Sequence, residues 1–98
     1  MITQHTPGPW RAGSIRGDLV DCIYSADSIR VATIETWIGP KESAESEANA
    51  RLIAAAPDLL AALQRAYVDI ATRKVRKGDG AILALLRTVI AKATGGQP

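Results

Sequence analysis

A proline in the middle of the most strongly helix-forming stretch constrains how this chain can fold. The stretch EANARLIAAAPDLLAAL, Glu47 to Leu63, is dominated by alanine and leucine and carries Pro57 among them. A proline inside a helix cannot donate the hydrogen bond to the preceding turn, and its ring clashes with that turn. The helix must therefore kink or restart at Pro57. A restart is attractive because proline suits the first helical position and Asp58 follows near the new positive end.

The residues before Pro57 predict a first helical segment. Ser43 is the expected N-cap, and Glu45 and Glu47 lie in the first turns, where the helix dipole favours negative charge. The segment also carries mostly small apolar residues at helical spacing, and their small side chains would let the segment lie close to a sheet. These residues are Ala44, Ala48, Leu52 and Ala55.

The residues after Pro57 predict a second segment and then a last helix. The apolar stripe of the second segment consists of Leu59, Leu60, Leu63, Tyr67 and Ile70. Arg65, Asp69 and Arg73 follow one another at i,i+4 steps, which is typical of a charged ladder on a helix. Asp79 is placed to cap the last helix, GAILALLRTVIAKA, whose apolar positions cover more than half of its circumference. Such a helix on a small domain predicts a second buried surface, most simply against a partner subunit.

The first part of the chain predicts a small antiparallel sheet. Between Thr6 and Ile38, glycine, proline and Asp-Ser turns separate short stretches that are rich in β-branched and aromatic residues. The expected strands lie in DLVDCIYS, in SIRVATIETWI and in PWRAGSI, the last from Pro9 to Ile15. Neither of the first two is cleanly amphipathic, so both faces of the sheet are expected to be covered.

We therefore predict an α+β fold in which a small N-terminal antiparallel sheet packs on a long, Pro-kinked helix followed by a second, C-terminal helix. A single domain would hold strands within residues 9–38, helices at about 43–73 and 80–94, and a flexible tail at 95–98. With 98 residues and no phenylalanine, the chain is near the small end for a self-sufficient core. A homo-oligomer is the natural expectation.

Composition excludes several classes of protein. A single cysteine, Cys22, and a single histidine, His5, exclude a disulfide framework and a self-contained zinc site, and no cofactor is expected. The single cysteine favours a reducing compartment. The N-terminal residues lack the features of a signal peptide and no apolar run is long enough to span a membrane, so we expect a cytosolic protein. His5 is interpreted as a surface residue and Cys22 as a small buried one. No acid/base pair or phosphate-binding loop is present, so an enzyme is not expected.

Basic residues raise the question of a nucleic-acid partner. The segment RKVRK, Arg73 to Lys77, would contact phosphates, or it is a solvated helix end where cations oppose the dipole. No recognition motif accompanies it. Because the net charge is only +2, a polyanionic partner is not required and nucleic acid is not the favoured partner.

Several residues are candidates for binding a small ligand, and each has a plain structural alternative. Trp37 would stack on a base or fill a core, and Asn49, flanked by alanines, would read a polar edge or face solvent. Arginines offer guanidinium forks that suit phosphates, or they form surface ion pairs. The arginines concerned are Arg16, Arg30, Arg51 and Arg65.

Two motifs carry a resemblance to known proteins. HTPGPW, His5 to Trp10, followed by short strands and EANARLIAAAPDLLAAL, resembles small proteins common in phage and prophage genomes. The order of elements also resembles the Thoeris anti-defence 1 family of phage proteins. Members of that family sequester nucleotide immune signals such as glycocyclic ADP-ribose, and some hold cyclic oligonucleotides, without cleaving them. They assemble as dimers and as hexamers built from dimers.

This resemblance implies a function and a site. The family's pocket uses an aromatic residue before the helix, an early asparagine, and an arginine and aspartate one turn apart, which Trp37, Asn49, Arg65 and Asp69 match in order. A phosphate-binding arginine from the strands would be Arg30 or Arg16, and Arg51 is a further candidate. The implied protein is a non-catalytic sponge in the cytoplasm of an infected bacterium. The alternative is a phage accessory protein that binds protein or nucleic acid through RKVRK.

Overall fold

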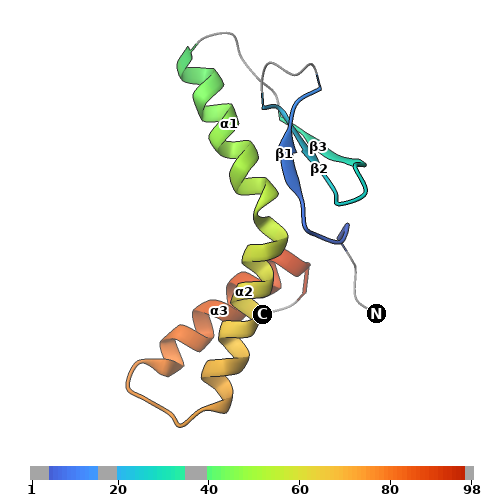
Figure 1. Ribbon diagram of the computed structural model, residues 1–98. Helices are drawn as coiled ribbons and strands as arrows, with labels where there is room; N and C mark the ends of the chain where they lie inside the picture. The colour runs from blue at the N-terminus through green and yellow to red at the C-terminus, as the bar shows by residue number, and fades with distance from the viewer. Residues whose placement is uncertain (1–4, 16–19, 35–39, 97–98) are drawn as a thin grey trace. The chain divides into compact units, whose positions relative to one another are not determined.

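A computed structural model describes residues 5–15, 20–34 and 40–96, which form two compact units (Figure 1). We call residues 5–58 the strand unit and residues 59–96 the helical hairpin. The described elements are β1 (Arg11–Gly13), β2 (Cys22–Tyr24), β3 (Arg30–Thr33), α1 (Pro40–Ala54), α2 (Ala56–Thr72) and α3 (Asp79–Thr94). The predicted α+β fold is thus confirmed, with three described helices rather than a kinked one and a second.

The three strands form one antiparallel sheet in the order β1-β2-β3. Ala12, Ile23 and Ala32 lie beside one another across it. Each strand lies inside its predicted stretch but is shorter, and the pairing of β2 with β3 is irregular between Ile23 and Tyr24. The sheet is therefore a small meander whose central strand supplies the residues that pack.

The core of the strand unit lies where α1 covers the sheet, and Figure 1 shows the sheet against this helix. Ile23 and Ala50 are fully buried and Ala54 is 8% exposed. The small side chains of Ala50 and Ala54 let the backbone of α1 approach the strands. The predicted packing face was wrong, because Ala44, Ala48 and Leu52 are exposed. Cys22 and Ile23 are adjacent on β2 and are both fully buried, so both faces of this strand are covered.

The motif HTPGPW contacts the part of EANARLIAAAPDLLAAL that belongs to the strand unit. Trp10, from HTPGPW, packs against the core cluster that contains Ala50 and Ala54. A Cβ atom built on Gly8 would lie 2.8 Å from the Cβ of Pro57. Glycine is therefore the residue that allows the N-terminal segment to lie against the proline. The proline has a packing role in addition to its effect on the helix.

The helix restarts at Pro57, as predicted. α1 ends at Ala54, and the Ala55 amide donates to the Arg51 and Leu52 carbonyls at 3.1 and 3.2 Å. α2 begins at Ala56, so that Pro57 lies in its first turn, where a missing amide hydrogen costs nothing. The predicted start of the first segment was wrong, because α1 begins at Pro40 rather than after Ser43. Proline again suits a helix start.

Two glycines bound α3. Its N-cap is Gly78 in a left-handed conformation, with φ of 91°, so the prediction that Asp79 caps this helix was wrong. Gly95 ends the helix with φ of 75°, and its amide donates to the Ala91 carbonyl. Gly96 donates to the same carbonyl at 3.0 Å. Gly95 and Gly96 thus close the C-terminal end of α3, and residues 97–98 of the predicted flexible tail lie outside the described residues.

Candidate functional site

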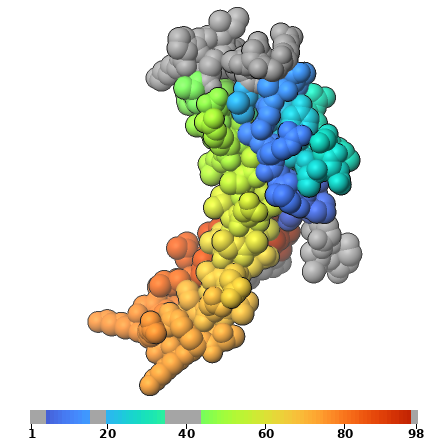
Figure 2. All heavy atoms as spheres, viewed as in Figure 1, coloured from blue at the N-terminus to red at the C-terminus, as the bar shows by residue number. Residues whose placement is uncertain are grey.

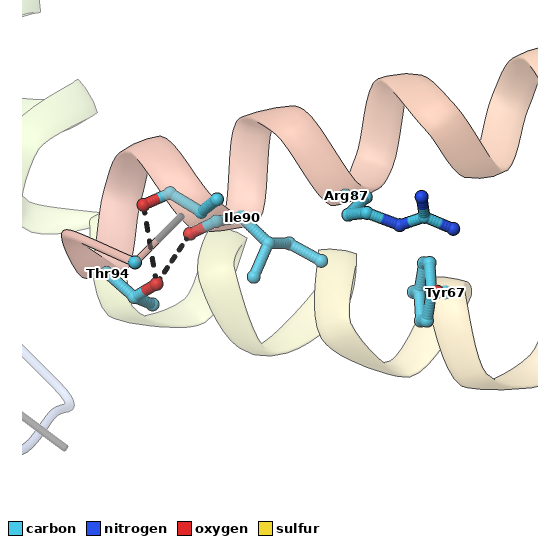
Figure 3. A pocket seen from close by; sticks show the side chains of 6 residues that line it. Tyr67, Arg87, Ile90 and Thr94 are labelled. Atoms are coloured by element: carbon cyan, nitrogen blue, oxygen red, sulfur yellow. Dashed lines mark hydrogen bonds between the residues drawn. The ribbon is translucent and has the colours of Figure 1, made fainter. Parts of the chain in front are cut away.

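A pocket of about 360 Å³ lies on the helical hairpin (Figure 3). All of its described lining residues belong to this unit: Tyr67 comes from α2, and the others come from α3 and the residues that follow it. The lining residues are Tyr67, Arg87, Ile90, Ala91, Thr94 and Gly96. Figure 3 shows Tyr67 and Arg87 toward one end of the pocket, Thr94 toward the other and Ile90 between them.

Helical spacing explains why these residues share one wall. Arg87, Ile90, Ala91 and Thr94 are separated by steps of three, one and three residues, so they lie on one face of α3. Ala91 is buried, and its small side chain leaves space beneath the larger residues. Tyr67 belongs to the half-buried stripe of α2, whose phenol ring supplies the opposite wall.

The pocket holds two polar groups that are not committed elsewhere. Within the described residues, the Arg87 guanidinium has no ion pair and the Tyr67 hydroxyl has no hydrogen bond. The Thr94 hydroxyl, in contrast, donates to the Ile90 carbonyl at 2.9 Å. An aromatic face and a free cation therefore lie beside an apolar floor. Small-molecule sites typically combine a mostly apolar lining with a few convergent polar groups.

The turn of the hairpin is held by an ion pair rather than by a core. Both terminal nitrogens of Arg73 donate to the Asp79 carboxylate at 3.0 Å, and the Arg76 amide donates to it at 2.7 Å. Asp79 is only 5% exposed. Its pKa lies below the ordinary value because the Arg76 amide and then the Arg73 guanidinium stabilise the charged form, although burial acts in the opposite direction.

This ion pair changes the interpretation of the RKVRK segment. Arg73 does not extend the predicted ladder of Arg65 and Asp69, because α2 ends at Thr72 and Arg73 turns to Asp79. The remaining residues of the segment, 74–77, are exposed, and Figure 2 shows side chains of this turn extending into solvent. The segment is thus partly a structural turn.

The predicted ligand-binding residues of the strand unit are separate from the pocket. Trp37 and Arg16 lie outside the described residues. Asn49 and Arg30 are exposed, and Arg51 is exposed and paired with Glu47 at 3.0 Å. None of these three side chains lines the hairpin pocket.

Arg65 and Asp69 come together on the hairpin, as their spacing predicted. The Arg65 Nε donates to the two carboxylate oxygens of Asp69 at 3.2 and 3.3 Å. Both side chains are largely exposed, and neither lines the pocket. At about 100° per residue, each lies on the opposite side of α2 from Tyr67. A ligand in the pocket would not touch this pair.

Sequence reasoning missed Arg87 and assigned Tyr67 only to an apolar stripe. The last helix was interpreted as an interface, so an arginine within it attracted no attention. A usable signal was present, since Arg87, Ala91 and Thr94 place a cation, a small residue and a hydroxyl on one face of an otherwise apolar helix.

The structure agrees with the interpretation of His5 as a surface residue and of Cys22 as a small buried one. His5 is exposed and lies edge-on to Trp10, with ring centroids 6.0 Å apart. The Cys22 thiol is buried and donates to the Asp21 carboxylate at 3.3 Å. Across residues 5–15, 20–34 and 40–96, no group of acidic, histidine or cysteine side chains has the arrangement of a metal site. No helix of the described chain combines the length and apolar character needed to cross a membrane.

These observations define a small α+β protein class: a three-stranded antiparallel sheet packed on a helix, with a helical hairpin that carries a pocket. Residues 1–97 match the family model described as Salmonella phage P22 protein Y8K6, and the chain belongs to this phage protein family. No curated protein and no solved structure gives a significant match. The family match confirms the resemblance to small phage proteins and gives no support to the resemblance to the Thoeris anti-defence 1 family.

Proposed function

We propose that this phage protein binds and sequesters a nucleotide immune signal, a cyclic ADP-ribose isomer or a cyclic oligonucleotide, without cleaving it. The observation that supports this proposal most directly is the hairpin pocket with its uncommitted Tyr67 and Arg87. A nucleotide presents a flat base and an anionic phosphate. An aromatic ring stacks on the first, and a guanidinium fork holds the second.

Magnitudes support binding at this site. Stacking of a base on an aromatic side chain contributes about 1 to 3 kcal/mol. Hydrogen bonds to a charged group contribute about 1.5 to 3 kcal/mol. The volume of about 360 Å³ falls within the range of small-molecule sites, toward its lower end. The sequence-based prediction places the ligand at a different site, in contact with Trp37, Asn49, Arg65 and Asp69. That site remains a competing position for the ligand.

The proposal is tested by releasing and identifying what the protein holds. Purified protein is heat-denatured and the supernatant analysed, and thermal shifts are measured against a panel of cyclic ADP-ribose isomers and cyclic oligonucleotides. A sponge releases its ligand intact and is stabilised by about 2.7 kcal/mol at 100 times the dissociation constant. Absence of a shift across the whole panel would refute the proposal, and recovery of a cleaved product would refute the non-catalytic part.

A second candidate function is an accessory role through the exposed RKVRK residues. Lys74, Arg76 and Lys77 are exposed at the hairpin turn, which suits contact with phosphates or an acidic partner. Arg73 is held by Asp79 and is less available. Binding to DNA would weaken steeply with salt, with a slope that falls when Lys74 and Arg76 are neutralised. A nucleotide sponge would retain its ligand in both variants.

We also propose that the chain forms a homo-oligomer, a dimer or a hexamer, through α3. Ile82, Leu85 and Val89 lie on one face of this helix and are 45%, 63% and 38% exposed. Their three- and four-residue spacing is that of a helix-packing stripe. A second copy that covers this stripe would remove apolar surface from water.

A further inference from the structure

We infer that two copies of this chain pair through α3 in an antiparallel orientation, around a two-fold axis that passes close to Leu85. This inference rests on the proposed homo-oligomer and assigns its geometry. Its projecting side chains are Ile82, Leu85 and Val89, which are 45%, 63% and 38% exposed. A helix that packs on a second copy of itself must present both the projecting side chains and the spaces that receive them.

The first step is that the same face of α3 supplies these spaces. In a helix pair, a projecting side chain enters a hole that residues i, i+3, i+4 and i+7 of the partner border. Exposed residues that are small or flexible flank the large ones at this spacing. They are Gly78, Ala81, Ala84, Thr88 and Lys92.

The second step is that the holes match the projecting side chains when the helices run in opposite directions. Ile82 of one copy enters the hole that extends from Leu85 to Lys92 on the other. Val89 enters the hole that extends from Gly78 to Leu85. Both contacts bring Ile82 of one copy beside Val89 of the other, and the two Leu85 side chains meet at the axis. The exposed face is therefore complementary to itself.

The third step is that this face can be covered without leaving a polar group unsatisfied. The Thr88 hydroxyl donates to the Ala84 carbonyl within the helix at 2.9 Å, so its methyl group is free to face a partner. Lys92 lies at the end of the face, where its aliphatic stem packs while the ammonium group reaches water. The only carboxylate of α3, that of Asp79, is buried and held by Arg73.

Charge selects the antiparallel orientation over the parallel one. In a parallel pair, Lys92 would meet Lys92 of the second copy, and the cationic segments 74–77 would lie at the same end. In the antiparallel pair these segments are separated by roughly 24 Å, the length of a 16-residue helix, whereas the Debye length is about 8 Å. Each segment then approaches only one lysine, Lys92 of the other copy. Opposed helix dipoles act in the same direction.

The pocket stays open in this pair. At about 100° per residue, Arg87 lies roughly 160° around the helix from both Leu85 and Val89. The wall that α3 contributes to the pocket therefore faces away from the second copy. Both chains of the pair keep an accessible pocket.

Disulfide cross-linking of the full chain tests the orientation. Ile82→Cys and Val89→Cys are mixed in equal amounts under reducing conditions, oxidised with copper phenanthroline and identified by intact mass. The mixed dimer is expected to exceed either self-linked dimer by at least roughly tenfold, because two copies of the same residue lie roughly 9 Å or more apart along the axis and a disulfide needs Cβ atoms about 4 Å apart. Leu85→Cys is expected to link to itself.

Two controls accompany this experiment. The natural chain is the blank, because every variant retains the buried Cys22. Leu52→Cys is the matched control, since Leu52 is 64% exposed, nearly the same fraction as Leu85, but lies on α1. It is expected not to link. Circular dichroism establishes that each variant is folded.

Lys92→Glu gives an independent measurement of the orientation. In the antiparallel pair it places a carboxylate near segment 74–77 of the other copy, so sedimentation equilibrium is expected to show association that is tighter by roughly two- to fivefold, with a smaller gain at high salt. In a parallel pair, one contact between like charges would replace another. The absence of any gain at low salt would therefore contradict the antiparallel orientation.

The outcomes separate this inference from the proposed homo-oligomer. If the chain stays monomeric and no variant links, a different protein covers this face or nothing does, and both fail. If Ile82→Cys and Val89→Cys each link to themselves and form no mixed dimer, α3 is the interface but the pair is parallel. If Leu52→Cys links as readily as Leu85→Cys, the association does not depend on α3 and this inference is overturned.

Discussion

The strand unit and the helical hairpin are stabilised in different ways. The strand unit has a core in which Cys22, Ile23 and Ala50 are fully buried. In the hairpin, none of the residues of α2, all of them described, is buried. Only Asp79, Leu86 and Ala91 are buried on α3. One unit excludes water with apolar packing, and the other depends on an ion pair at its turn.

This difference teaches how a small chain can combine stability with binding. Alanines on α1 close the strand unit over the sheet, and the contact of Gly8 with Pro57 secures its N-terminal segment. The hairpin keeps apolar side chains accessible, and its Arg87 is exposed and has no ion pair among the described residues. We therefore expect mutations in the strand unit to change stability and mutations in the hairpin to change binding and association.

The largest expected effect is the loss of a core side chain. Ile23→Ala removes a fully buried residue at the centre of the sheet and is expected to cost about 2 to 5 kcal/mol of stability. Val68→Ala on α2, where the residue is 54% exposed and lies outside the proposed oligomer stripe, is the control and is expected to cost less than about 1 kcal/mol. Urea unfolding measures both. Equal losses would contradict the proposed division between the two units.

A second prediction concerns two glycines with opposite surroundings. Gly8→Ala would place a Cβ atom 2.8 Å from the Cβ of Pro57, so the variant is expected to lose about 1 to 3 kcal/mol. Gly80→Ala in α3 meets no atom within 4 Å and is expected to gain up to about 1 kcal/mol from helix propensity. Thermal unfolding compares the two variants. The same sign for both would show that contact with Pro57 is not what requires glycine.

Local chemistry explains which features the sequence predicted. The break at Pro57 follows from the missing amide hydrogen, and the three strands follow from β-branched residues between turns. The start of α1 was missed because the sequence analysis placed the N-cap at Ser43, whereas α1 begins at Pro40. A proline suits the first position of a helix as well as the end of a strand region. Proline has both roles, and the sequence alone does not distinguish a residue that ends one element from one that starts the next.

The pocket could not be predicted because it depends on packing between distant segments. Tyr67 and Arg87 lie on different helices, and only the reversal of the chain at Gly78 brings them together. The role of Asp79 was missed for a related reason. A carboxylate before a helix predicts a cap, but its partner Arg73 lies across the turn, and the two guanidinium bonds outcompete a local one.

The third prediction concerns how the stability that the Arg73–Asp79 ion pair gives to the hairpin depends on pH. The pKa of Asp79 is lowered in the folded state, so its stabilising contribution is present above the ordinary value of 3.8 and is lost as the pH falls through the lower folded value. Asp79→Asn is expected to be less stable than the natural chain at pH 7, with the difference disappearing under strongly acidic conditions. Thermal melts across this pH range test the sign. A difference that persists at low pH would mean that geometry, not charge, holds the turn.

The last prediction concerns a substitution in the exposed apolar stripe of α3. We expect it to have the smallest effect on folding stability and a specific effect on oligomerisation. Leu85→Gln changes a side chain that is 63% exposed, so folding stability should change by less than about 0.5 kcal/mol. Because Ile82 and Val89 adjoin it on the same face, the variant is expected to shift the chain toward smaller species in light scattering. Leu52→Gln is the control, since Leu52 is 64% exposed but lies on α1 among small residues. If both variants dissociate the chain equally, or neither does, the association does not depend on α3, and the hairpin is distinguished by its pocket alone.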